Sequence, residues 1–188
     1  MKKIKLYIYI ILSLSLFSCF NQEIGKALVA TDSLSIEIKQ IEEKYNSIDF
    51  VKFNNIYDTI KQDIDTIGKY MITLPENKEW KNSLSIYQNA YKQSKQYVNK
   101  KFNHDIEYSK NQIQNLRTDI SRNAINADSL KQYIKTEKDA INTLRKDVNT
   151  LYLNYNQALD KYNKSKTNIN LFIDSLISTN KKDIEIKQ

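Results

Sequence analysis

Two side chains of this 188-residue chain stand out chemically, because Cys19 is its only cysteine and His104 its only histidine. A single thiol cannot close a disulfide within the chain, and one thiol with one imidazole is too few ligands for a structural zinc site. His104 lies in a polar stretch of a predicted long helix, which is typical of a surface residue rather than a triad base. Gly25 and Gly68 are too far apart to form a phosphate-binding loop. We therefore predict no catalytic, metal-binding or cofactor-binding residues.

The residues before Cys19 have the order of a secretion signal. Three lysines within the first five residues are followed by an apolar run, Leu6–Phe17, and then by the small Ser18. The run is about 12 residues long, whereas a helix needs about 20 to cross the hydrocarbon core of a bilayer. We expect a cleaved signal peptide over residues 1–18 rather than a permanent membrane span.

The sequence Leu16-Phe17-Ser18-Cys19 resembles the lipobox of bacterial lipoproteins. Leu16, Ser18 and Cys19 match it, whereas Phe17 stands where a small or β-branched residue is usual. The resemblance implies cleavage between Ser18 and Cys19 and attachment of lipid to the Cys19 thiol, which anchors the protein in a membrane. The alternative, a cysteine near an ordinary cleavage site by chance, is disfavoured because no A-x-A-like site lies nearby.

Composition predicts one helical domain and argues against a nucleic-acid partner. The net charge of +7 includes the three lysines of the signal, so the mature chain would carry +4, with lysines and acids interspersed. Two glycines and one proline are too few for the turns of β-sandwiches and α/β folds. We therefore predict an all-α fold, an elongated antiparallel helical bundle or coiled coil.

Apolar residues recur at steps of three and four from about residue 24 onward, as on one face of a helix. They predict two shorter helices, about 24–47 and 49–73, with Asp49 as a candidate cap for the second and a break at Pro75. The expected segments after the signal are a lipidated tether over 19–23, a single helical-bundle domain over 24–180 and a polar tail over 181–188.

The longer patterns predict an antiparallel hairpin of two helices, about 76–122 and 128–179. The connection falls near residues 121–128, where Asp128 or Asn126 would cap the second helix. Apolar positions of that second helix alternate by four and three over about seven heptads, which requires a supercoiled partner.

A turn centred near residue 124 would place Tyr91 opposite Ala158, and Leu84 with Trp80 opposite Ser165. Large residues would then face small ones, which makes the tyrosines part of the core. The two shorter helices would pack on this hairpin, either end to end along it or as a hairpin of their own against one half.

Glu137 lies on the apolar stripe of the predicted helix 128–179, where a charge is costly unless it is paired. It would either pair with an arginine or lysine across the bundle, or lie where a third helix is absent and water reaches it. Bidentate pairing would favour arginine over lysine, with Asp119 or Glu137 as candidate partners of the chain's three arginines, Arg117, Arg122 and Arg145. Arg117 and Arg145 occupy equivalent places in two similar segments, as aligned coiled-coil segments do.

The short lipid signal, the early broken helix and the long hairpin around Glu107–Asp119 resemble uncharacterised helical lipoproteins of Bacteroidetes-type bacteria. That resemblance implies an envelope location and a helical fold, but no known activity. Phe20 after the cysteine, where aspartate would retain the protein inside by the sorting rule of enteric bacteria, favours the outer membrane, on either face.

The expected function is that of a non-enzymatic spacer, scaffold or protein-interaction module of the cell envelope. It would be held in the membrane through Cys19 and would bind a protein of unknown identity or a second copy of itself. The alternative is a ligand-binding or envelope-perturbing protein with a pocket between its helices, lined by the tyrosine-rich seam.

Acylation of Cys19 is directly testable by labelling. Cells that express the protein and are fed a radioactive or clickable fatty acid should incorporate the label into it, because the thiol is the expected attachment point. A protein that stays unlabelled would contradict the lipoprotein assignment.

Overall fold

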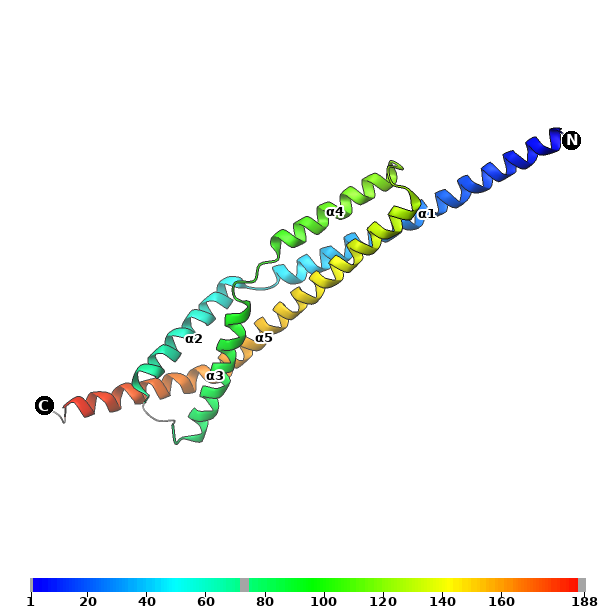
Figure 1. The fold of residues 1–188 in the computed structure, drawn as a ribbon. Helices are drawn as coiled ribbons and strands as arrows, with labels where there is room; N and C mark the ends of the chain where they lie inside the picture. Colours follow the sequence, from blue (N-terminus) through cyan, green and yellow to red (C-terminus); the bar gives the residue numbers. More distant parts are fainter. Residues whose placement is uncertain (1, 72–74, 186–188) are drawn as a thin grey trace. The chain divides into compact units, whose positions relative to one another are not determined.

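The computed structural model describes residues 2–71 and 75–185, and the side chains of 22–71, 75–126 and 129–180. Within these ranges the chain forms five helices and no strand, which confirms the predicted all-α helical bundle. The helices, shown in Figure 1, are α1 (Lys2–Asn46), α2 (Phe50–Tyr70), α3 (Lys78–Tyr97), α4 (Asn103–Ser121) and α5 (Ala127–Glu185).

The helices group into two compact units, and the single helical-bundle domain expected over 24–180 stays a prediction. Unit 1 comprises residues 1–45 and 102–148, and therefore α1, α4 and the first part of α5. Unit 2 comprises residues 46–101 and 149–188, and therefore α2, α3 and the rest of α5. Each unit is thus a three-helix bundle, and α5 contributes one helix to both.

Side-chain caps set three of the helix starts. Asp49 accepts a hydrogen bond from the Lys52 backbone N–H at 2.8 Å, which confirms the predicted cap of α2. Asn77 caps α3 in the same way, two residues after Pro75. Of the two caps considered for the last helix, Asn126 accepts from the Ser129 N–H at 2.8 Å.

The prediction of one helix over 76–122 is wrong at residues 98–102, where α3 ends and α4 begins. No glycine or proline marks this break, so tertiary contacts must stabilise it. The Phe102 ring packs edge-on against Tyr45 of α1, with ring centroids 6.3 Å apart, and the Phe102 N–H reaches the Tyr45 hydroxyl at 3.4 Å. These contacts compensate for the helical hydrogen bonds that the chain gives up here.

The outer bounds of two helices also differ from the prediction. The backbone of α1 is helical from Lys2, so the expected lipidated tether, residues 19–23, is part of this helix. No glycine or proline precedes Gly25, and nothing in this stretch therefore opposes a continuous helix. At the other end α5 continues to Glu185, into the predicted polar tail 181–188, of which residues 186–188 lie outside the described part.

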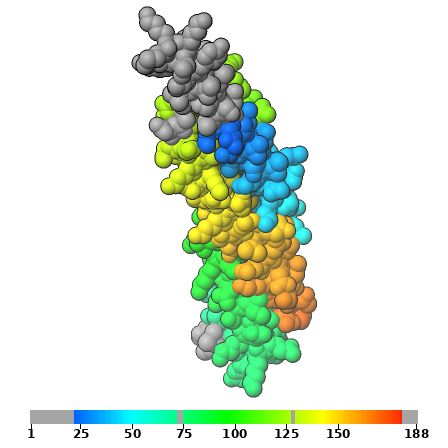
Figure 2. Space-filling model, turned by 90° about the vertical axis from the view of Figure 1, so that its right-hand side faces the viewer, coloured from blue at the N-terminus to red at the C-terminus, as the bar shows by residue number. Residues whose placement is uncertain are grey.

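Unit 1 is held by apolar packing and by ion pairs between α1 and its two neighbours. Figure 2 shows the surface of α1, in blue, adjoining that of the first part of α5, in yellow. The ion pairs join acids of α1 to bases of α4 and α5. They are Asp32–Arg117 (2.7 Å), Glu42–Lys110 (3.1 Å), Glu23–Lys131 (3.5 Å) and Glu37–Arg145. The order of these pairs makes α1 antiparallel to α4 and parallel to α5.

These pairs correct the expected partners of the arginines. Arg117 and Arg145 bind Asp32 and Glu37, both on α1, rather than Asp119 or Glu137. The similar segments around the two arginines therefore have a structural reason, because α4 and α5 each present one arginine to the same third helix.

Unit 2 packs α2, α3 and α5 around aromatic side chains, as the predicted tyrosine core requires. Tyr87 is fully buried and lies near Tyr162, with ring centroids 6.0 Å apart. Trp80 contacts Phe172 at 5.3 Å. Further contacts join Phe53 to Tyr155 at 5.5 Å and Tyr57 to Tyr91 at 5.6 Å.

The register between α3 and α5 lies within a few residues of the one expected from a turn near residue 124. Gln93 donates to Gln157 at 2.8 Å, and Asn168 donates to Ser83 at 3.1 Å. Ala158 and Ser165, the expected small partners, are fully buried.

The two placements considered for the shorter helices can also be compared with the structure. α1 packs in unit 1 and α2 in unit 2, so each lines its own part of α5. This assigns them to different units rather than to a hairpin of their own.

The Glu37–Arg145 pair predicts a charge-swap experiment on unit 1. Glu37→Arg or Arg145→Glu alone should lower the free energy of unfolding by about 1 kcal/mol, because like charges then face each other in a partly exposed pair. The double variant should recover most of this loss in urea denaturation. As a control, swapping the exposed Lys39–Glu43 pair within α1 should change stability by less than about 0.5 kcal/mol. Simple additivity of the two single changes would contradict the pairing.

Candidate functional site

The predicted lipidation site lies in the helical part of the chain before the described side chains begin. Ser18 and Cys19 belong to the α1 backbone, and their side chains lie outside the described set. Cleavage after Ser18 and lipid attachment to Cys19 therefore stay predictions. Over the part of the chain that the structure describes, no helix combines the length and apolar character needed to cross a membrane.

His104 lies on the surface at the start of α4. Its side chain is 92% exposed, stacks on Tyr108 with ring centroids 6.4 Å apart, and has Nδ1 3.7 Å from an Asp105 oxygen. Among the described residues, no group of three or more histidines, cysteines and acids is arranged to hold a metal ion. This environment is that of the surface residue expected from the sequence.

A polar cluster in unit 2 joins its three helices at Asp63. Tyr87 donates its hydroxyl to Asp63 Oδ2, and Lys166 Nζ lies 2.6 Å from the same oxygen. Burial, followed by the hydrogen bond to Asp63, raises the pKa of Tyr87 far above its ordinary value of 10.0. The phenol therefore stays protonated and serves as a buried donor, which links α3 to α2 and cannot act as a base.

On the surface of unit 1, acidic and aromatic side chains line the seam between α4 and α5, on the side away from α1. Two hollows of about 260 and 350 Å³ follow each other along this seam, one helical turn apart. We call them together the α4–α5 groove. The α4 side is lined by Phe102, Asp105, Tyr108, Ser109, Gln112, Asn115, Leu116 and Asp119, and the α5 side by Tyr133, Glu137, Ala140, Thr143, Leu144 and Asp147. Ile125, in the connection between the two helices, also lines the groove.

Every charged residue that lines the α4–α5 groove is an acid, although the chain has 29 lysines and arginines against 22 acids. The four acids are Asp105, Asp119, Glu137 and Asp147. Among the ion pairs of the described residues, none joins these four to a lysine or arginine. The groove therefore presents negative charge that the described lysines and arginines do not neutralise by pairing.

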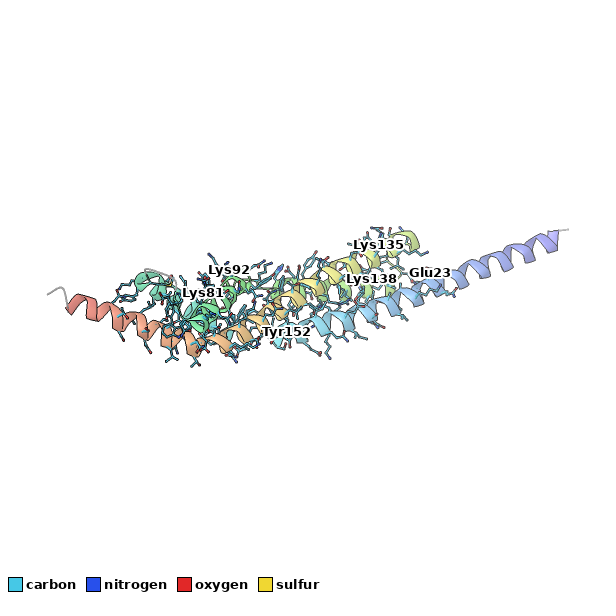
Figure 3. The ribbon with its side chains drawn as sticks, turned by 90° about the horizontal axis from the view of Figure 1, so that it is seen from below. Glu23, Lys81, Lys92, Lys135, Lys138 and Tyr152 are labelled. Carbon is cyan, nitrogen blue, oxygen red and sulfur yellow. The ribbon has the colours of Figure 1, made fainter. Side chains whose placement is uncertain are left out.

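The acids of α1 explain this segregation of charge. At about 3.6 residues per turn, Lys110 and Arg117 fall on the α1 side of the buried stripe of α4, and Asp105 and Asp119 fall on the other side. Helix α5 has the same arrangement, with Arg145 toward α1. Lys135 and Lys138, labelled on α5 in Figure 3 and both exposed, likewise lie outside the groove lining. The bases gather where α1 supplies acids, and acids remain on the opposite flank.

The linings of the other two hollows of unit 1 contain more bases than acids. The hollow between α1 and α4, about 460 Å³, is lined by Lys39, Glu42, Lys110 and Arg117, and Lys110 is already paired with Glu42. The hollow between α1 and α5 contains Glu23 beside Lys131 at 3.5 Å. Lys39 and Arg117 are paired with Glu43 and Asp32, which lie outside the lining of the first hollow. The α4–α5 groove differs from both hollows because its acids have no lysine or arginine partner among the described residues.

Two tyrosines and an unpaired glutamate complete the groove. Tyr108 and Tyr133 are 58% and 51% exposed, while Leu116 and Leu144 form a buried floor. Glu137 is half-buried, and desolvation raises the pKa of its carboxyl above the ordinary value of 4.5. Of the two environments expected for Glu137, pairing across the bundle is wrong for the described residues, and partial exposure to water is what the structure shows.

The sequence reasoning singled out Glu137 but missed the groove around it. The available signal was the helical spacing of Asp105, Tyr108, Gln112 and Asp119 along one flank of α4. That spacing acquires meaning only when α1 is known to cover the opposite flank, and this requires the tertiary structure.

Glu137 predicts a pH-dependent stability difference. A carboxyl whose folded-state pKa is raised stabilises the fold below the ordinary pKa, and this contribution is lost as the pH rises from about 4.5 through the raised value. Glu137→Gln should therefore be more stable than the wild type at pH 7, and the difference should disappear at pH 3 in thermal unfolding. Asp119 and Tyr133, which line the groove beside Glu137, are kept unchanged.

Asp139→Asn is the matched control, because Asp139 is an exposed acid of α5 outside the groove. It removes the same charge from an exposed position, so it should not raise the stability at pH 7 as Glu137→Gln does. Equal pH profiles for the two variants would contradict a desolvated Glu137.

Comparisons with protein-family models, with curated proteins and with solved structures find no match to this chain. A function must therefore be argued from its own residues and their geometry.

Proposed function

We propose that this protein is a non-enzymatic lipoprotein of the bacterial cell envelope, anchored through lipid on Cys19, that presents helical units as a scaffold or protein-interaction module. The observation that carries the proposal is how the polar side chains of the helices are used. Those that meet between helices, such as Asp63 with Tyr87 or Glu37 with Arg145, bind one helix to another. The polar side chains that do not join helices lie on the described surface, and this surface, which includes the α4–α5 groove, is available to bind a partner protein.

The lipid-anchored location rests on the signal-like residues 1–19 and stays independent of the helical units. With Leu16, Ser18 and Cys19 matching a lipobox, cleavage before Cys19 would leave the anchor at the N-terminal end of the remaining part of α1. An anchor at one end of a helix leaves the remaining described surface of unit 1 available to partners. The outer membrane is the proposed location.

The alternative, a ligand pocket lined by the tyrosine-rich seam, is less well supported. Tyr87, Ala90 and Ala158 are fully buried, so side chains fill the described part of that seam. The hollow in unit 2 that Tyr162 does line, about 370 Å³, also contains Asp49, Lys52 and Asn55 of α2 and opens at the surface.

The proposal predicts where the protein is found and what it contacts. In fractionated envelopes the wild type should be in the outer-membrane fraction. A variant in which residues 1–19 are replaced by an ordinary cleavable secretion signal should be in the soluble fraction, because the lipid anchor is lost. Cross-linking of intact cells should give a discrete larger complex with the wild type.

Two results would contradict this proposal. If the wild type is found in the soluble fraction, the proposed lipid anchor is wrong. If no cross-linked complex forms across several cross-linker lengths, the proposed interaction with a partner protein is wrong.

A further inference from the structure

The α4–α5 groove has the dimensions and floor of a helix-binding site. From Asp105 to Asp119 it follows α4 for about four turns, or roughly 20 Å at about 1.5 Å per residue. Leu116 and Leu144 form an apolar floor, and the half-exposed Tyr108 and Tyr133 lie along it. Exposed tyrosines over an apolar floor are typical of protein-binding surfaces, where an amphipathic helix inserts its apolar face.

The negative charge of the groove favours a positively charged partner. Its lining contains four acids and no base, and Glu137 is a half-buried carboxylate without a cation among the described residues. A cationic side chain placed beside Glu137 would offset the cost of desolvating it. Complementarity of charge therefore requires a basic helix and disfavours an acidic or neutral one.

Two other occupants fit the groove less well. A metal ion would need clustered ligands, and the described residues contain no such group. A second copy of this chain could offer the lysines of α3, including Lys81 and Lys92 of Figure 3. Between these two on the same exposed face lie Ser85 and Gln88, so that face supplies charge but no apolar side chain for the groove floor.

We infer that the α4–α5 groove docks a basic amphipathic helix of about four turns from another protein of the envelope. This inference rests on the proposed interaction function and names the surface and the chemistry of its partner. Lysines or arginines of the partner lie beside Asp105, Asp119, Glu137 and Asp147, and its apolar face covers Tyr108 and Tyr133.

Binding of defined peptides tests the groove. The probe is a fluorescent 16-residue helical peptide of leucine and lysine with one apolar face, titrated in fluorescence anisotropy against the full chain isolated from its envelope in a neutral detergent. A peptide with the same composition but scrambled leucines, and one with glutamate in place of lysine, serve as controls. The amphipathic basic peptide should bind more tightly than both, because only it offers charge and an apolar face together.

Matched variants place the binding in the groove. Asp119→Asn with Glu137→Gln should weaken binding about tenfold, since two favourable charge interactions are lost. Asp139→Asn with Glu43→Gln removes the same net charge outside the groove and should leave affinity unchanged. Tyr133→Ser should weaken binding without changing charge. Circular dichroism verifies that each variant stays folded.

Four outcomes would overturn the inference. Equal losses for the groove and control variants would mean unspecific attraction, and equal affinity for the scrambled peptide would mean that no apolar face docks. Self-association in light scattering that Asp119→Asn with Glu137→Gln abolishes would assign the groove to a second copy of the chain. If the peptides fail but intact cells still give a cross-linked complex, the groove is wrong and the proposed function stands; if both fail, both are wrong.

Discussion

The structure depends on the apolar stripe of α5, which must serve two different pairs of helices. Its fully buried positions recur mainly at three, four and seven residues from Ile141 through Leu151, Ala158 and Ser165 to Ile169. In unit 1 this stripe meets α1 and α4, and in unit 2 it meets α2 and α3. A continuous heptad pattern in one helix thus supplies the core of both units, while the chain that covers it is interrupted.

This constraint explains which parts of the fold could be predicted from the sequence. Periodicity predicted α5 well, because a long regular stripe is the most reliable local signal. Asp49, Asn126 and the break at Pro75 were recognisable from local chemistry. The break at 98–102 was not, because the contact of Phe102 with Tyr45 joins residues 57 positions apart and leaves no trace in local propensity.

The charges of unit 1 follow from the same three-helix arrangement. Sequence alone suggested that Arg117 and Arg145 would find partners within the hairpin, since the position of α1 was open. Asp32 and Glu37 of α1 pair with these arginines, and the acids on the other flank of α4 and α5 have no lysine or arginine partner among the described residues. The α4–α5 groove is therefore a consequence of how α1 docks, which is why local patterns could not reveal it.

Glu137 is the position where this arrangement works against the stability of unit 1. A leucine there would continue the stripe from Ile134 to Ile141 and avoid the desolvation that raises the glutamate pKa. Natural proteins place an unpaired charge at an otherwise apolar position mostly at functional sites, where a partner supplies the missing interaction. A basic side chain from outside the chain would convert the uncompensated carboxylate into an ion pair. Together with the shape and charge of the α4–α5 groove, this desolvation cost is an argument for binding there.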